Sequence, residues 1–141
     1  LTKVEKVTVS FEQIISPHVS EPEPNIYSNC LISGNQLYMS GMTAGDGKDG
    51  VLGDGTPFDQ SRQCLFKIKN LVEAAGCTLD DVVKLTIYLT DIHDRVEFGR
   101  ARAEFFKGVM PCSTLVGITA LAQPGLVVEV DAVALLHGIT N

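Results

Sequence analysis

The sequence contains no cluster of lysine and arginine residues. Its 11 basic residues are scattered among 17 acidic ones, which gives a formal net charge of −6. A nucleic-acid-binding surface usually shows as a basic patch or stripe. We therefore expect no nucleic-acid partner for this chain.

Long apolar runs and paired cysteines are absent as well. No apolar run reaches the length that spans a membrane, and residues 1–11 contain no signal-peptide core. The four cysteines form no CxxC pair, and their wide spacing matches no zinc-binding pattern. These absences predict a cytoplasmic protein with free thiols, without a metal site and without a membrane partner.

Recognisable catalytic and nucleotide-binding motifs are also missing. There is no GxSxG nucleophile elbow, and the literal GxGxxG at Gly45–Gly50 leads into more glycine and aspartate. A dinucleotide site needs that motif to open a helix whose N-terminus faces the pyrophosphate. We therefore interpret the whole segment Gly41–Pro57 as a mobile, solvated loop.

What the sequence does contain is the pattern of one domain over residues 1–141. Its hydrophobic content of 45% fits a globular chain that buries about two thirds of its unfolded surface. Helical periodicity predicts helices over Phe58–Ala75 and Asp94–Lys107. Alternation and turn signals predict strands over Lys3–Phe11, Asn29–Ile32, Gln36–Ser40, Val83–Leu89, Ser113–Leu121 and Leu126–Leu136.

This order of elements predicts an α+β fold, with two helices packed on one face of a mixed six-stranded sheet. The chain has no further helix for the other face of the sheet. Several strands nevertheless carry apolar residues on both sides, so that face needs cover. We therefore expect a homo-oligomer with cyclic symmetry.

The last predicted strand carries two acids in an otherwise apolar run. Alternation places Glu129 and Asp131 on one face and leaves the opposite face wholly apolar. A carboxylate on so apolar a strand needs a partner or water. This face is either the wall of a polar pocket, with Glu129 as a general acid or base, or a sheet edge that faces solvent.

Two other residues are candidates for ligand contact. Tyr27 lies between a proline-rich connector and a predicted hairpin, where it either stacks on a ligand or forms an ordinary part of the surface. Cys112 lies at the entry of a predicted strand. The sequence names no base or cation that would lower its pKa, which favours a small, partly buried thiol.

Three segments of the chain carry distinctive local patterns. They are Tyr27-Ser28-Asn29 with Ser40-Gly41, residues 63–91 with AAG at 74–76 and DDVVK at 80–84, and residues 127–134, VVEVDAVA. Together they resemble the RidA/YjgF family of enamine and imine deaminases, also known as L-PSP. The first is similar to the family's PYSQ…VSG segment, the second to its first helix and the strand that follows, and the third to its terminal VEIEAIA.

The resemblance implies a chorismate-mutase-like fold and a homotrimer without a cofactor, with ligand clefts between subunits. It also implies a hydrolase that converts a small reactive imine or enamine, such as 2-aminoacrylate, to a keto acid and ammonia. By matching positions, Glu129 would orient or activate the attacking water. The substrate-binding positions would be Tyr27, Ser40, Gly41, Cys112 and Ser113.

Cys112 stands where the family's deaminases carry an arginine, whose charged planar fork grips the substrate carboxylate. A thiol makes no such grip, so we expect a substrate less anionic than an amino-acid-derived imine. Two alternatives stay open. One is a ligand-binding or regulatory trimer in which Cys112 senses oxidants or electrophiles. The other is an endoribonuclease or translation inhibitor of the L-PSP type, which the acidic charge disfavours.

Overall fold

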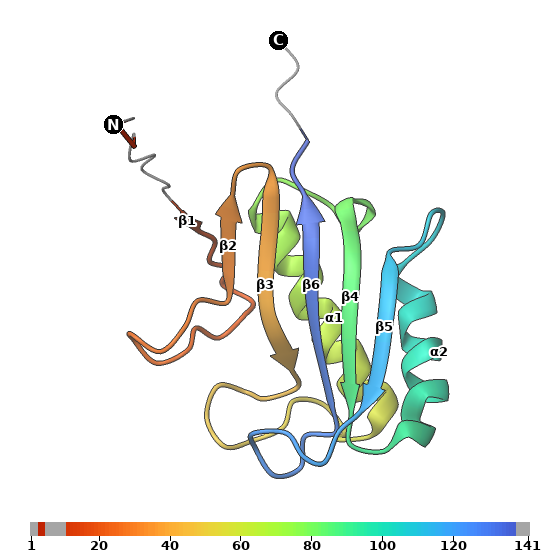
Figure 1. Ribbon diagram of the computed structural model, residues 1–141. Helices are drawn as coiled ribbons and strands as arrows, with labels where there is room; N and C mark the ends of the chain where they lie inside the picture. Colours follow the sequence, from red (N-terminus) through yellow and green to blue (C-terminus); the bar gives the residue numbers. More distant parts are fainter. Residues whose placement is uncertain (1–2, 5–10, 138–141) are drawn as a thin grey trace.

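The structure, a computed structural model, describes residues 3–4 and 11–137. A mixed six-stranded sheet carries two helices on one face, as predicted (Figure 1). The strand order is β1-β2-β3-β6-β4-β5, and all neighbours are antiparallel except β4 and β5. The strands are β1 Glu12–Gln13, β2 Cys30–Ser33, β3 Gln36–Thr43, β4 Val82–Leu89, β5 Cys112–Gly117 and β6 Val128–Leu135. The helices are α1 Pro57–Ala74 and α2 Arg95–Phe105, with short 3-10 helices η1 Leu79–Asp81 and η2 Ile92–Asp94.

The core lies between the two helices and the inner face of the sheet. α1 crosses the middle strands, and α2 lies at the β5 end (Figure 1). The apolar face predicted for the last strand is buried there, with Val128, Val130, Ala132 and Ala134 at 0–1% exposure. Burying a large apolar side chain of this kind contributes roughly 1.5–3 kcal/mol. Neither helix of the described ranges has the length and apolar content that a membrane-spanning helix needs.

One predicted strand is shorter in the structure for a reason of pairing. The predicted strand Ser113–Leu121 ends at Gly117, because β4, its one neighbour among the described strands, ends at Leu89, the residue that pairs with Gly117. Beyond that pair the backbone N–H of Ile118 donates to the carbonyl of Leu89 at 2.8 Å, and the ladder stops. The first predicted strand, Lys3–Phe11, lies largely outside the described residues.

A bulge changes which way one predicted core residue points. The register of β4 against β6 shifts between Val82 and Lys84. Val82 is buried at 4% exposure, whereas Val83 is 38% exposed. Strict alternation along the predicted strand Val83–Leu89 places Val83 on the same face as the buried Leu85. That prediction is wrong, because the extra residue in the bulge shifts the alternation by one.

The GxGxxG segment opens no helix. The Asp46 carboxylate accepts hydrogen bonds from the backbone N–H groups of Lys48 and Gly50, at 2.8 and 3.1 Å. These bonds hold the pKa of Asp46 below its ordinary value. α1 begins only at Pro57. Residues 45–50 are a turn closed by a carboxylate, as the loop prediction expects. The prediction is wrong at both ends, because β3 continues from Ser40 to Thr43 in its pairing with β6, and Pro57 is the first residue of α1.

Candidate functional site

A row of polar side chains crosses the face of the sheet that the helices leave uncovered. Glu129 and Asp131 of β6 project there, and they pair across the ladder with Tyr88 and Thr86 of β4. The Tyr88 hydroxyl donates to Oδ2 of Asp131 at 3.0 Å, and this hydrogen bond raises the pKa of Tyr88. Asp131 therefore has a partner inside the chain.

Glu129 is half-buried, and no side chain of the described residues donates a hydrogen bond to its carboxylate. Burial raises the pKa of Glu129, and the nearby charge of Asp131 raises it further. A carboxylate with a raised pKa exchanges protons closer to neutral pH than an ordinary glutamate does. That is the property a general acid or base requires.

The backbone of β3 makes room for this carboxylate. The register of β3 against β6 shifts between Met39 and Met42, so Ser40 and Gly41 lie in a bulge. A Cβ atom added at Gly41 would lie 2.6 Å from Cδ of Glu129, so only glycine fits the present arrangement. The Ser40 hydroxyl donates to the carbonyl of Ser28 at 2.6 Å and ties the bulge to the segment that carries Tyr27.

Tyr27 and Gly41 line the same cavity, which has a volume of about 250 Å³. The Tyr27 side chain is 57% exposed at its rim. The sequence analysis missed Lys67, which also lines this cavity: it is only 8% exposed, and its Nζ donates to the carbonyl of Gly45 at 2.7 Å. Burial lowers the pKa of Lys67. Its place on the buried stripe of α1, four residues before Leu71, is the signal that could have identified it.

Cys112 lies far from Glu129 within one chain. Cys112 pairs with Lys84 of β4, and Lys84 pairs in turn with Val133 of β6. Cys112 therefore lies two strands away from β6, level with a residue that is four positions after Glu129. With the usual strand dimensions, about 3.3 Å per residue and 4.8 Å between strands, the two Cα atoms are about 16 Å apart. The two residues therefore do not share one small site within a single chain.

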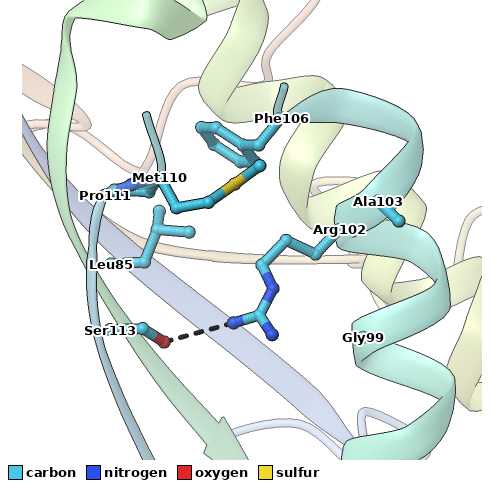
Figure 2. Close-up of a pocket in the computed structure, with 8 residues that line it drawn as sticks. All are labelled: Leu85, Gly99, Arg102, Ala103, Phe106, Met110, Pro111 and Ser113. Carbon is cyan, nitrogen blue, oxygen red and sulfur yellow. Dashed lines mark hydrogen bonds between the residues drawn. The ribbon is translucent and has the colours of Figure 1, made fainter. Parts of the chain in front are cut away.

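The thiol of Cys112 is exposed, so the expectation of partial burial is wrong. Cys112 opens the edge strand β5, and the next residue, Ser113, faces the helices, which turns the Cys112 side chain to the uncovered face of the sheet. The Ser113 hydroxyl accepts a hydrogen bond from Nη1 of Arg102 on α2 at 3.3 Å (Figure 2). The structure therefore places the Ser113 side chain on the opposite side of the sheet from Glu129.

Among the described residues, no group of three His, Cys, Asp or Glu side chains lies close enough to hold a metal ion. The polar groups that do gather are a free carboxylate at Glu129, the backbone of the Ser40–Gly41 bulge and the phenol of Tyr27 at the rim of the adjoining cavity. Such a set can bind a small polar molecule and move a proton.

The four cysteines are expected to differ sharply in reactivity towards iodoacetamide. Burial raises the pKa of Cys30 and of Cys64 to about 12, and it also raises the pKa of Cys77. Because the thiolate is the nucleophile, the native protein should be alkylated rapidly only at the exposed Cys112. Mass spectrometry of the native protein checks this. Rapid native labelling that persists in a Cys112→Ser variant would contradict it, and denaturant should expose all four thiols.

Comparison with known proteins places the chain in one family. Residues 20–136 match the family model described as Endoribonuclease L-PSP. RutC family protein PH0854 of Pyrococcus horikoshii is 37% identical over 77% of this chain and 85% of its own length. Human 2-iminobutanoate/2-iminopropanoate deaminase is 30% identical over 82% of this chain and 83% of its own length. The crystal structure of RidA from the Antarctic bacterium Psychrobacter sp. PAMC 21119 superimposes with a TM-score of 0.77 at 30% identity, covering 89% of this chain and 100% of that one.

The α+β fold and these matches define a protein of the RidA/YjgF class. The chain belongs to the Endoribonuclease L-PSP family, which also includes relatives named as deaminases.

Proposed function

We propose that this protein is a hydrolytic deaminase that acts on a small reactive imine or enamine and releases ammonia. The observation that carries the proposal is the Glu129 carboxylate, which is half-buried, has a raised pKa and lies against the Gly41 backbone without a donor from the described side chains. The 30% identity to the human 2-iminobutanoate/2-iminopropanoate deaminase supports the same reaction class.

The uncovered sheet face supports an oligomer, and the family resemblance supports three subunits with ligand clefts between them. Tyr38, Val116 and Leu135 each expose 39–46% of their surface there, which is costly for large apolar side chains unless another subunit covers them. The separation of Cys112 from Glu129 within one chain points the same way. In this arrangement Cys112 of one subunit approaches the Glu129 cluster of the next.

The proposed reaction needs one water molecule and a group that moves its protons. Glu129 takes a proton from water as the water oxygen adds to the imine carbon, and it passes that proton to the imine nitrogen, which gives a carbinolamine. Glu129 then takes the hydroxyl proton of the carbinolamine and passes it to the nitrogen as the C–N bond breaks, so a carbonyl compound and ammonia leave. An enamine reaches the same path after it tautomerises to the imine. No metal or cofactor takes part in this scheme.

The substrate is expected to carry little or no negative charge at the position that Cys112 contacts. A thiol offers no permanent charge and no pair of parallel donors for a carboxylate. We also propose a cytoplasmic location, which is supported by four unpaired cysteines.

The decisive experiment is a panel of imines generated in solution by an amino-acid oxidase, with ammonia release measured for the wild type, Cys112→Arg and Cys112→Ser. Every imine in this panel carries a carboxylate, so the wild type should exceed the buffer rate only modestly. Imines made from simple primary amines by an amine oxidase carry no carboxylate, and the wild type should turn them over faster. Cys112→Arg should raise turnover of amino-acid-derived imines by about tenfold or more, because each hydrogen bond to a charged group contributes about 1.5–3 kcal/mol. Cys112→Ser is the matched control and should not show this gain.

Two outcomes would count against the proposal. Activity in Cys112→Arg together with a silent wild type would favour a ligand-binding or regulatory trimer that has kept its cleft. Silence in both proteins across the panel would show that the deaminase assignment is wrong.

A further inference from the structure

A second cavity lies on the helix side of the sheet, between α2 and the ends of β4 and β5 (Figure 2). Its volume is about 400 Å³, within the range of small-molecule sites. The side chains of Leu85, Ala103, Phe106, Met110 and Pro111 form an apolar wall around it. Glu129 projects from the other side of the sheet, so this cavity is separate from the proposed deaminase site.

The cavity exists because the residues of α2 that face it include two with little or no side chain. Gly99 and Ala103 lie one turn apart on the helix and both line the cavity. A Cβ atom added at Gly99 would meet no heavy atom within 4 Å, so the space in front of this glycine is open. The fully buried Leu85 of β4 lines the same space, and Met110 at its margin is 54% exposed. The apolar wall is therefore formed but not filled.

One charged group reaches into this apolar space. The Arg102 guanidinium points across the cavity and donates to the Ser113 hydroxyl at 3.3 Å (Figure 2). Its central carbon lies 5.4 Å from the centroid of the Phe98 ring, so the aromatic face also holds it in place. The guanidinium is thus oriented before any ligand arrives.

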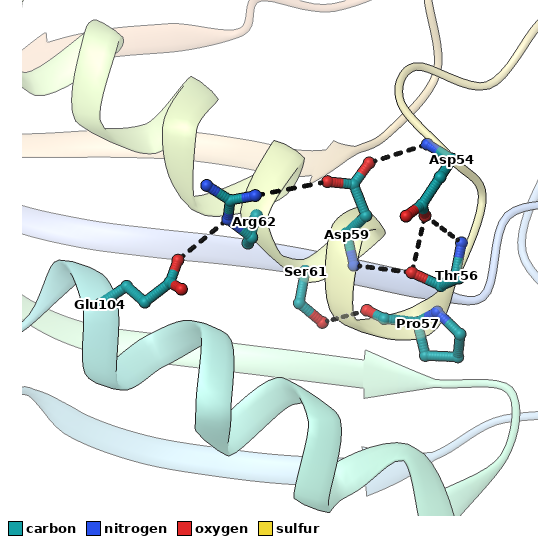
Figure 3. A network of polar contacts seen from close by, with 7 residues as sticks. All are labelled: Asp54, Thr56, Pro57, Asp59, Ser61, Arg62 and Glu104. Atoms are coloured by element: carbon teal, nitrogen blue, oxygen red, sulfur yellow. Dashed lines mark hydrogen bonds and ion pairs between the residues drawn. The ribbon is translucent and has the colours of Figure 1, made fainter.

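Arg102 differs from two neighbouring arginines in its charge balance. Arg62 pairs with Glu104 at 2.9 Å and with Asp59 at 3.8 Å, as Figure 3 shows. Arg100 pairs with Glu97 at 2.7 Å. By contrast, no carboxylate of the described residues lies within 4 Å of the Arg102 guanidinium, so its remaining N–H groups have no anionic partner among them.

We propose that this cavity binds a small monocarboxylate with a short apolar tail. The carboxylate accepts two parallel hydrogen bonds from Arg102, and the tail packs against Phe106 and Met110. A second negative charge on the tail would face the apolar wall without a partner, which disfavours dicarboxylates. The proposal does not depend on deaminase activity.

The test is a titration of the whole protein with hexanoate, followed by amide chemical shifts and by calorimetry. Saturable binding should perturb the amides of residues 99–106 and 110–113. Arg102→Gln should weaken hexanoate binding by about tenfold or more, because it removes the charge-assisted hydrogen bonds. Arg100→Gln is the matched control on the same helix and should leave the affinity unchanged.

Gly99→Leu separates binding from folding. The added side chain should fill the open space in front of residue 99 and abolish binding. The same change should raise Tm, because leucine is a far better helix former than glycine. Hexanol should bind at least tenfold more weakly than hexanoate if the guanidinium recognises the carboxylate.

The proposal would be overturned if the wild type showed no saturable hexanoate binding. It would also be overturned if hexanol and hexanoate bound with equal affinity, or if Arg102→Gln left the affinity for hexanoate unchanged. Shifts confined to the Glu129 side of the sheet would also overturn it, because they would assign the carboxylate to the other cavity.

Discussion

Replacing Gln60 with leucine is expected to lower the free energy of unfolding by about 3–5 kcal/mol. Gln60 is a fully buried polar side chain on α1. Its Nε2 donates to the carbonyls of Gly55 and Gly125, at 3.0 and 2.8 Å, and its Oε1 accepts from the backbone N–H of Val127 at 2.9 Å. Leucine has a similar volume, but it would leave all three backbone groups without that partner, at a cost of about 1–3 kcal/mol for each one that stays buried.

These hydrogen bonds also hold the backbone in place where the chain enters β6. Val127 is the residue directly before the strand that carries Glu129. Urea denaturation followed by circular dichroism measures the loss. The matched control is Gln63→Leu on the same helix, since Gln63 forms no side-chain hydrogen bond with the described residues, and it should change stability by no more than about 0.5 kcal/mol. Equal losses in both variants would show that the three hydrogen bonds of Gln60 do not contribute to the free energy of unfolding.

The parts of the fold that local periodicity determines could be predicted from the sequence. The periodicity that predicts the helix Phe58–Ala75 places Leu65, Ile68 and Leu71 on one apolar stripe, and all three are fully buried. Alternation on β6 correctly separated its apolar face from the face that carries Glu129. Both patterns follow from the geometry of a single element, so no knowledge of its neighbours is needed.

The parts that depend on neighbouring elements could not be predicted in this way. Cys112 is exposed because β5 is an edge strand, and its own residues do not state which strand lies at the edge. Gln60 lies on a buried stripe, yet nothing in the sequence indicates that its amide closes the loop before β6. The contact between Gly41 and Glu129 joins two strands that are far apart in the chain, so only the family resemblance pointed to it.

Glu129→Gln is expected to have the largest effect on activity, lowering kcat for imine hydrolysis by about 10²–10⁴-fold. Glutamine has nearly the same shape as glutamate and fits the same space beside Gly41, but it takes up no proton from water. The measurement is steady-state ammonia release on the best substrate of the imine panel. Unchanged turnover would show that Glu129 is not the proton acceptor.

The same substitution should raise stability near neutral pH. The pKa of Glu129 lies above its ordinary value of 4.5 in the folded state, so folding disfavours the ionised form. The stability associated with this group is fully present below its unfolded pKa and is lost as the pH rises through the folded pKa. Glutamine does not ionise and avoids this loss. Urea denaturation at matched protein concentration should therefore show the variant gaining on the wild type as the pH rises from acidic to neutral.

Asp131→Asn tests whether the ionisation of Glu129 controls the rate. Asparagine retains an acceptor for the Tyr88 hydroxyl, but it removes the negative charge that helps to raise the pKa of Glu129. In a plot of kcat against pH, the acidic limb should therefore move to lower pH. The rate on the plateau should change little. If the limb stays in place, the ionisation that controls the rate belongs to another group. If the plateau itself collapses, Asp131 takes a direct part in the chemistry, and the division of roles between the two acids must be reversed or shared.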